Sequence, residues 1–222
     1  MSPDDIVRID IFGEGRADVG QDDRLREPTG GVVPILVHRL CGKPATMRVK
    51  CYKQVHLERI EPQFRSGYEQ KAERFRKLAR QNKARGAVFV VDSDGKVDER
   101  RAQLVAGRDA GPSEPPMAVG VAHPCVEAWL LADATAVRRG MGLPRTPNVP
   151  DQPEQLPPEK QRPDHPKKVL AKAAGTRGPD LSAPKKDKIA KAMNDPALVR
   201  QRCPLGFAPF ADEVEEHIHP LF

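Results

Sequence analysis

The feature that most constrains the fold of this chain is a strand–helix alternation that repeats four times before residue 142. Short apolar runs predict the strands, and apolar residues spaced three or four positions apart predict the helices between them. An alternation of this kind implies a parallel sheet with helices on both faces, so we expect an α/β fold. The predicted strands cover residues 6–12, 47–51, 87–91 and 117–122.

The chain changes character after Gly142. Residues 144–166 contain eight Pro, which argues against a packed element there. The segment 159–191 carries ten Lys or Arg and four Asp or Glu, and its net charge of +6 equals that of the whole chain. We therefore expect an α/β domain over 1–142 and a Pro-rich, basic extension over 143–222, with an apolar set near the end that docks back on the domain.

Composition and local patterns exclude several classes of protein. No apolar run approaches the roughly 18 residues that span a bilayer. The first residues are acidic and lack the apolar core of a signal peptide. Cys41 and Cys51 lie in apolar patterns, as buried free thiols do, and the four Cys include no CxxC pair. We expect a cytoplasmic protein with reduced thiols and no membrane partner.

Three carboxylates follow the ends of two predicted strands. Glu14 comes just after the run 6–12, and Asp92 and Asp94 come just after the run 87–91. The carboxyl ends of parallel strands share one edge of the sheet, which is where ligands bind in open α/β folds. Three carboxylates there would repel one another, and a hard cation such as Mg²⁺ or Mn²⁺ removes that cost by binding their oxygens. The pattern predicts a metal site suited to phosphate chemistry.

Two residues near the fourth predicted helix are further candidates for this edge. Glu127 lies in the first turn, where it either completes the metal site or only stabilises the helix dipole. His123 precedes the helix and is a candidate to donate to a phosphate or to exchange a proton, with a purely structural role as the alternative. The apolar positions from Val126 to Val137 predict one helix.

The acidic motifs resemble the Toprim domain of topoisomerases, primases and OLD-type nucleases. The resemblance covers residues 5–140 and is carried by Gly13-Glu14-Gly15 with Asp18, and by Val90-Val91-Asp92-Ser93-Asp94-Gly95. It implies a compact parallel α/β sheet with metal-binding acids at the strand ends.

Two later segments narrow the resemblance to a bacterial group of Toprim-like, OLD-nuclease-related proteins of largely unknown function. These segments are His123-Pro124-Cys125-Val126-Glu127-Ala128-Trp129-Leu130-Leu131 and Cys203-Pro204 with Phe207. Members of the group are often encoded beside an ABC- or SMC-type ATPase in phage-defence loci. The resemblance therefore implies an ATPase as a partner.

The basic segment suggests a polyanionic partner. Its lysines are candidates to grip a nucleic-acid backbone, with DNA favoured over RNA. The alternative is a solvated segment that keeps a Pro-rich chain soluble. The candidate residues are Lys167, Lys168, Lys185 and Lys186.

Together these patterns predict a nuclease that depends on Mg²⁺ or Mn²⁺, with Glu14, Asp92 and Asp94 as catalytic residues. One alternative is a non-catalytic partner subunit that binds an ATPase or nucleic acid, and another is an enzyme with a small phosphate substrate. Hydrolysis is favoured over re-ligation because the two tyrosines, Tyr52 and Tyr68, lie within the α/β section and not on a separate module.

Overall fold

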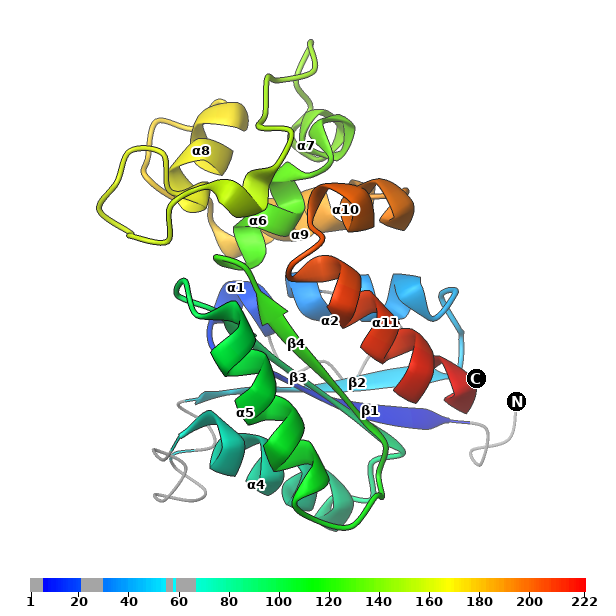
Figure 1. The fold of residues 1–222 in the computed structure, drawn as a ribbon. Helices are drawn as coiled ribbons and strands as arrows, with labels where there is room; N and C mark the ends of the chain where they lie inside the picture. The colour runs from blue at the N-terminus through cyan, green and yellow to red at the C-terminus, as the bar shows by residue number, and fades with distance from the viewer. Residues whose placement is uncertain (1–5, 21–29, 55–57, 59–66) are drawn as a thin grey trace.

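A four-stranded parallel sheet organises the chain, as a computed structural model shows for residues 6–20, 30–54, 58 and 67–222 (Figure 1). The strand order is β2-β1-β3-β4 and every neighbouring pair is parallel, so the connection from β2 to β3 passes over β1. This confirms the predicted α/β fold. The strands are β1 (Val7–Gly13), β2 (Met47–Lys53), β3 (Gly86–Asp92) and β4 (Met117–Ala122).

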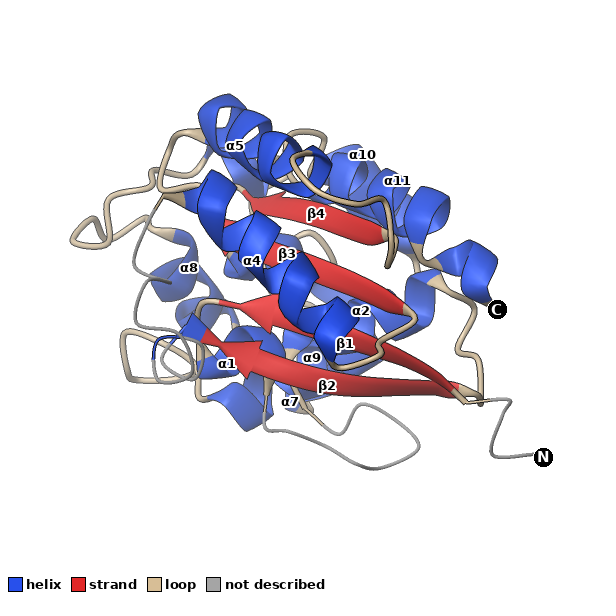
Figure 2. Cartoon of the chain, turned by 90° about the horizontal axis from the view of Figure 1, so that it is seen from below, coloured by secondary structure: helices blue, strands red, loops and turns tan. Residues whose placement is uncertain are grey.

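Two helices, α4 (Tyr68–Gln81) and α5 (Val97–Asp109), cover one face of the sheet (Figure 2). Their apolar positions meet a compact aromatic cluster. Phe12 of β1 stacks on Phe89 of β3 at 4.2 Å between ring centroids, and Phe75 of α4 packs against both. All three rings are fully buried, so this face of the sheet is closed by helices that the sequence pattern predicted.

The other face is covered by α2 (Val32–Leu40) together with helices from the C-terminal third of the chain. Trp129 stacks on Phe210 of α11 at 5.2 Å between ring centroids. Helix α11 also packs against β4, and α9 packs against α2. The basic extension therefore shares one hydrophobic core with the sheet. Its helices are α8 (Pro166–Ala173), α9 (Ala183–Ala192), α10 (Pro196–Arg202) and α11 (Phe207–His217), with the 3₁₀ turns η3 (Pro153–Gln155) and η4 (His219–Leu221).

The helix expected from Val126 to Val137 is two helices, α6 (Val126–Leu131) and α7 (Ala134–Met141). Asp133 separates them because its side chain accepts a hydrogen bond of 2.8 Å from the backbone N–H of Ala136, which caps α7. A short helix α1 (Arg16–Val19) follows β1.

The Pro-rich stretch contributes one buried anchor. The carboxylate of Glu154, in η3, accepts hydrogen bonds from the backbone N–H groups of Leu205, Gly206 and Phe207, at the start of α11. This contact ties the Pro-rich stretch to the last helix of the chain.

The cysteines and the helix lengths agree with the sequence pattern. All four cysteines are free and buried, as the apolar patterns predicted for Cys41 and Cys51. No helix in the described ranges combines the length and the apolar character that crossing a bilayer requires.

Candidate functional site

The carboxyl edge of the sheet brings Glu14 and Asp92 together. Glu14 directly follows β1, and Asp92 is the last residue of β3. The backbone N–H of Asp92 donates to Oε2 of Glu14 at 3.2 Å, and the hydroxyl of Tyr68 donates to Oε1 at 2.8 Å. Both oxygens of Glu14 are thus held, and its carboxylate is fixed beside the end of the neighbouring strand.

Asp18 joins this edge from α1. The backbone N–H of Gly15 donates to Oδ2 of Asp18 at 2.7 Å, so the turn after β1 folds the aspartate back toward the strand end. Burial, with the nearby charge of Glu127, raises the pKa of Asp18 to about 6. In the sequence, only the family resemblance points to Asp18.

Asp92 lies among other carboxylates at this edge, and its pKa is raised by burial and by them. Its carboxylate accepts a hydrogen bond of 3.2 Å from the backbone N–H of Val126, at the start of α6. Burial raises the pKa of Asp92 well above its usual range, and the charges of Asp18, Glu127 and Glu14 raise it further. The four acidic residues Glu14, Asp18, Asp92 and Glu127 therefore form one repelling group, which we call the carboxylate cluster.

Glu127 is the buried member of the carboxylate cluster. It is 3% exposed, and its Oε1 lies 2.5 Å from Nζ of Lys186 and 3.9 Å from Nζ of Lys167. Burial alone would raise the pKa of Glu127, but the two lysines outweigh burial and lower it. Lys186 also pairs with Asp180 at 2.9 Å. The lysines come from α9 and α8, which lie beyond the carboxyl ends of the strands (Figures 1 and 2).

Asp94 lies outside this group of contacts. It sits in the turn after β3 with a φ of 47°, a left-handed conformation that Asp tolerates better than most residues. Its side chain is 51% exposed, and its carboxylate is 3.9 Å from Nζ of Lys160. The structure therefore separates the predicted pair, with Asp92 in the carboxylate cluster and Asp94 toward solvent.

His123 lies at the same edge, just after β4. Its Nδ1 is 2.8 Å from Oγ of Ser93, which is fully buried and also accepts a hydrogen bond from the N–H of Gly95 at 3.2 Å. Burial lowers the pKa of His123, which favours the neutral imidazole. Ser93 thus anchors one ring nitrogen of His123 to the turn that follows β3.

The four lysines predicted to contact nucleic acid lie in different environments. Lys186 is buried in its ion pairs, which removes its ammonium group from any surface that a nucleic acid can touch. Lys167 is partly exposed beside Glu127. Lys168 and Lys185 are also partly exposed, and Nζ of Lys168 donates to the backbone oxygen of Gln161 at 2.6 Å.

The donor chemistry of the carboxylate cluster fits a hard divalent cation, because all its side-chain donors are oxygens. Within the described residues, no three His, Cys, Asp or Glu side chains are gathered as a ready metal cage. Mg²⁺ commonly uses one or two protein carboxylates and keeps several water ligands, so it does not require such a cage. Glu14 and Asp92, which meet at the ends of β1 and β3, are the residues that would hold the ion.

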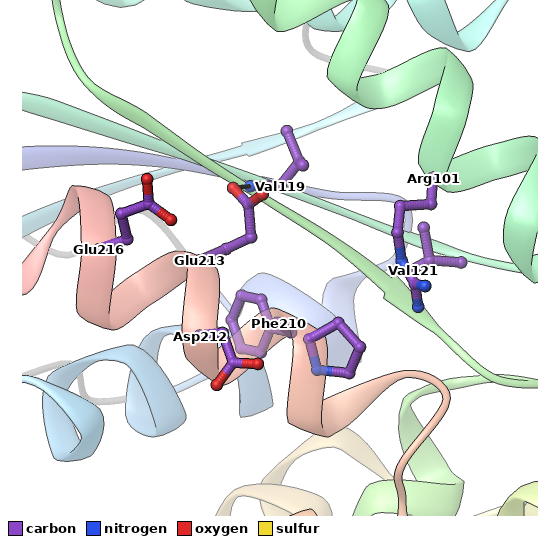
Figure 3. Close-up of a pocket in the computed structure, with 8 residues that line it drawn as sticks. Arg101, Val119, Val121, Phe210, Asp212, Glu213 and Glu216 are labelled. Atoms are coloured by element: carbon purple, nitrogen blue, oxygen red, sulfur yellow. Dashed lines mark hydrogen bonds between the residues drawn. The ribbon is translucent and has the colours of Figure 1, made fainter.

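A separate hollow of about 220 Å³ lies along the outer edge of β4, against α5 and α11 (Figure 3). Glu213 dominates its chemistry, because one carboxylate oxygen accepts the backbone N–H of Val119 at 3.2 Å and pairs with Arg108 at 2.7 Å. Covering an unpaired N–H on an edge strand discourages pairing with another chain. We therefore assign this hollow a structural role.

The fold and the site define an α/β protein whose parallel sheet carries a carboxylate cluster at its carboxyl edge. A family model described as "Domain of unknown function (DUF4276)" matches residues 33–215, and the chain belongs to this family. No curated protein and no solved structure matches the sequence. The matched range includes Asp92, Glu127 and Lys186, whereas Glu14 and Asp18 precede it.

Proposed function

We propose that this protein hydrolyses phosphodiester bonds of nucleic acid with a divalent cation, Mg²⁺ or Mn²⁺, held at the carboxylate cluster. The observation that carries the proposal is the meeting of Glu14 and Asp92 at the carboxyl edge of the sheet, where the backbone N–H of Asp92 donates to Oε2 of Glu14 at 3.2 Å. Burial and the neighbouring carboxylates raise the pKa of Asp92 well above its usual range, which is consistent with repulsion among these acids. A bound cation would offset the repulsion among these carboxylates.

Different residues at this edge would bind the cation, orient a carboxylate and contact the substrate. Carboxylate oxygens of Glu14 and Asp92 would hold the cation, and Tyr68 fixes the orientation of Glu14 through its 2.8 Å hydrogen bond. A cation so held supplies polarisation of the phosphate and a lowered pKa of bound water. Lys167 adds a partly exposed positive charge beside the acids, where the phosphate of a substrate would lie.

Tyr68 supports hydrolysis over a covalent route. Its hydroxyl lies at the carboxylate cluster, where a tyrosine nucleophile would have to be. However, burial and the neighbouring Glu14 raise its pKa, which disfavours the phenolate that attacks phosphorus. The hydroxyl is also committed as a donor to Glu14. Water is therefore the nucleophile that this arrangement favours.

The proposal extends to the partners that the sequence suggests. The chain has a net charge of +6, which favours a polyanion, and we propose DNA ahead of RNA. We also propose an ABC- or SMC-type ATPase partner and a role in phage defence, both implied by the family resemblance. A location in the cytoplasm agrees with the four free, buried cysteines, since thiols stay reduced there.

A second candidate function is a non-catalytic subunit that binds an ATPase or nucleic acid. One observation favours it: Lys186 and Lys167 already offset part of the negative charge of the carboxylate cluster through Glu127. A cluster stabilised by its own lysines needs a cation less than an uncompensated one does.

A cleavage assay separates the two functions. Purified protein is incubated with supercoiled plasmid, single-stranded DNA and RNA in the presence of Mg²⁺, Mn²⁺ or EDTA. We expect cleavage with either cation, none with EDTA, and loss of activity in Asp92→Asn. Asp98→Asn is the matched control because Asp98 is 95% exposed on α5, so it should cleave normally. Metal-bound protein that cleaves none of these substrates would favour the non-catalytic subunit.

A further inference from the structure

Two cationic side chains, Lys71 and Arg100, contact the ring of Tyr68 next to Glu14, and no carboxylate of the described residues pairs with either cation. We propose that Lys71 and Arg100 form an anion site that takes a backbone phosphate of a nucleic acid at this edge of the sheet. The inference deepens the proposed function, on which it rests for the identity of the substrate.

The fold brings the two cations together at the carboxyl edge. Lys71 is the fourth residue of α4 and Arg100 is the fourth residue of α5, and these helices pack against each other on one face of the sheet (Figure 2). Nζ of Lys71 lies 4.8 Å from the centroid of the Tyr68 ring, and the central guanidinium carbon of Arg100 lies 4.1 Å from it. The hydroxyl of the same ring donates to Glu14, so one tyrosine connects both cations to the acidic edge.

Lys71 is buried without a partner of opposite charge. It is 7% exposed, and within the described ranges its ammonium group contacts only the face of the Tyr68 ring. Lys186, the other buried lysine of the described chain, is held by two carboxylates. Burial of an unpaired charge is unfavourable, and contact with an aromatic face offsets only part of the cost. An anion bound at Lys71 would supply the missing partner.

Arg100 has donors available for the same anion. Its Nη1 donates to Oε1 of Gln103 at 3.3 Å, whereas its Nε is buried and has no hydrogen-bond partner among the residues that the structure describes. The contact with Tyr68 uses the flat face of the guanidinium group, and the N–H donors lie in its plane, where they match a phosphate. Burial and Glu14 raise the pKa of Tyr68 and Arg100 lowers it, so Arg100 and Glu14 both act on that hydroxyl.

A phosphodiester is the anion that fits this pair of cations best. It offers two terminal oxygens, one for the guanidinium group of Arg100 and one for the ammonium group of Lys71. The net charge of +6 on the chain favours a polyanion over a single carboxylate. A nucleic acid held in this way would have a phosphate next to Glu14, where the proposed hydrolysis takes place.

The test measures phosphate binding by the full chain in EDTA, so it requires neither a metal ion nor cleavage. One probe is a fluorescein-labelled single-stranded DNA, followed by fluorescence anisotropy. The other is inorganic phosphate, followed by the melting temperature at constant ionic strength. Lys71→Met and Arg100→Gln are compared with the unmodified protein and with Lys77→Met and Arg80→Gln, which remove exposed charges from α4. Arg100→Lys keeps the charge but loses the planar fork.

We expect Lys71→Met and Arg100→Gln to weaken DNA binding at least about tenfold, as the loss of a charge-assisted hydrogen bond does. Both should also lose the rise in melting temperature that phosphate gives the unmodified protein. Arg100→Lys should retain part of the DNA affinity, and the two control variants should stay within about twofold of the unmodified protein, since salt screens distant exposed charges. Without phosphate, Lys71→Met should melt no lower than the unmodified protein, because no ion pair is broken.

Unchanged DNA affinity in a folded Lys71→Met or Arg100→Gln would overturn the inference. An equal loss in Lys77→Met and Arg80→Gln would also overturn it, because the effect would then follow from net charge. If the variants lose the response to inorganic phosphate but keep their DNA affinity, the site takes free phosphate and its assignment to nucleic acid is wrong. A protein that binds DNA as expected but neither binds Mn²⁺ nor cleaves would overturn the proposed function alone.

Discussion

The hydroxyl of Tyr68, at the first residue of α4, donates a hydrogen bond of 2.8 Å to Oε1 of Glu14, although the two residues are 54 positions apart. The guanidinium group of Arg100 lies 4.1 Å from the centroid of the Tyr68 ring and helps to fix its position. A helix from one face of the sheet thus orients a carboxylate at the end of β1. Tyr68 is therefore a positioning residue for Glu14.

Replacing Tyr68 by Phe should weaken Mn²⁺ binding several-fold, because the carboxylate of Glu14 loses the donor that orients it. A hydrogen bond to a charged group contributes about 1.5–3 kcal/mol, so the free energy of unfolding should also fall by about that amount. Tyr52→Phe is the matched control, since its hydroxyl donates to a different carboxylate, Asp10, at 3.1 Å. Calorimetry on both variants should show a loss of Mn²⁺ affinity only for Tyr68→Phe. Equal affinities would contradict the positioning role.

Breaking the pair of Glu127 and Lys186 should destabilise the fold strongly. Either Glu127→Gln or Lys186→Gln leaves a buried charge without its main partner, which typically costs about 3–5 kcal/mol. The double variant should recover most of this loss, because replacing both members of a buried ion pair is often neutral. Urea unfolding of the four proteins gives the coupling energy. Single variants that lose less than about 1 kcal/mol would show that the pair is solvent-accessible.

Without a divalent cation, the contribution of Asp18 to stability should fall as the pH rises from about 4 to above 6. The pKa of Asp18 is about 6 in the folded protein, against an ordinary value of 3.8. Between these values the folded state binds more protons than the unfolded state, so raising the pH favours unfolding. The shift corresponds to roughly 3 kcal/mol at most. Asp92 acts in the same direction, since its pKa is also raised.

Urea unfolding at several pH values in EDTA measures this dependence. Asp18→Asn should flatten it, because an amide does not titrate. Saturating Mn²⁺ should also flatten it at neutral pH, where the ion replaces protons on the carboxylates. A slope as steep in Asp18→Asn as in the unmodified protein would assign the pH dependence to other groups.

The partly exposed lysines of the basic segment should contribute sequence-independent affinity for nucleic acid. Replacing Lys168 and Lys185 by Gln should reduce the slope of log K against log salt by about 1–2, if each contacts one phosphate. The paired control is Lys43→Gln with Lys83→Gln, since these residues precede β2 and β3 at the opposite edge of the sheet. Fluorescence anisotropy over a salt series measures both. An unchanged slope in the first pair would place the nucleic acid elsewhere.

The sequence predicted the sheet and part of its acidic edge because both follow from local patterns. Apolar runs marked the four strands, and the rule that parallel strands end at one edge placed Glu14 beside Asp92. Asp133 indicates the start of a new helix, since an Asp just before a helical run is a common N-cap. That signal would have divided the helix predicted from Val126 to Val137.

The contacts that complete the site could not be predicted in this way. Lys186 pairs with Glu127, which is 59 positions earlier in the chain. The spacing of apolar residues predicts helices, but it does not predict which side chains come into contact when the helices pack. The exposure of Asp94 depends on the path of the turn after β3, and Asp-x-Asp-Gly alone does not specify it. Tertiary packing, not local pattern, decides which acids belong to the carboxylate cluster.

Calorimetric titration with Mn²⁺ tests the central claim most directly, because it measures whether Asp92 belongs to a divalent-cation site. The unmodified protein is compared with Asp92→Asn and with the exposed control Asp98→Asn, and circular dichroism checks that each is folded. We predict saturable binding by the unmodified protein and by Asp98→Asn, and at least about tenfold weaker binding by Asp92→Asn, a difference of about 1.4 kcal/mol. Equal affinity in a folded Asp92→Asn, or no binding by the unmodified protein, would contradict the account.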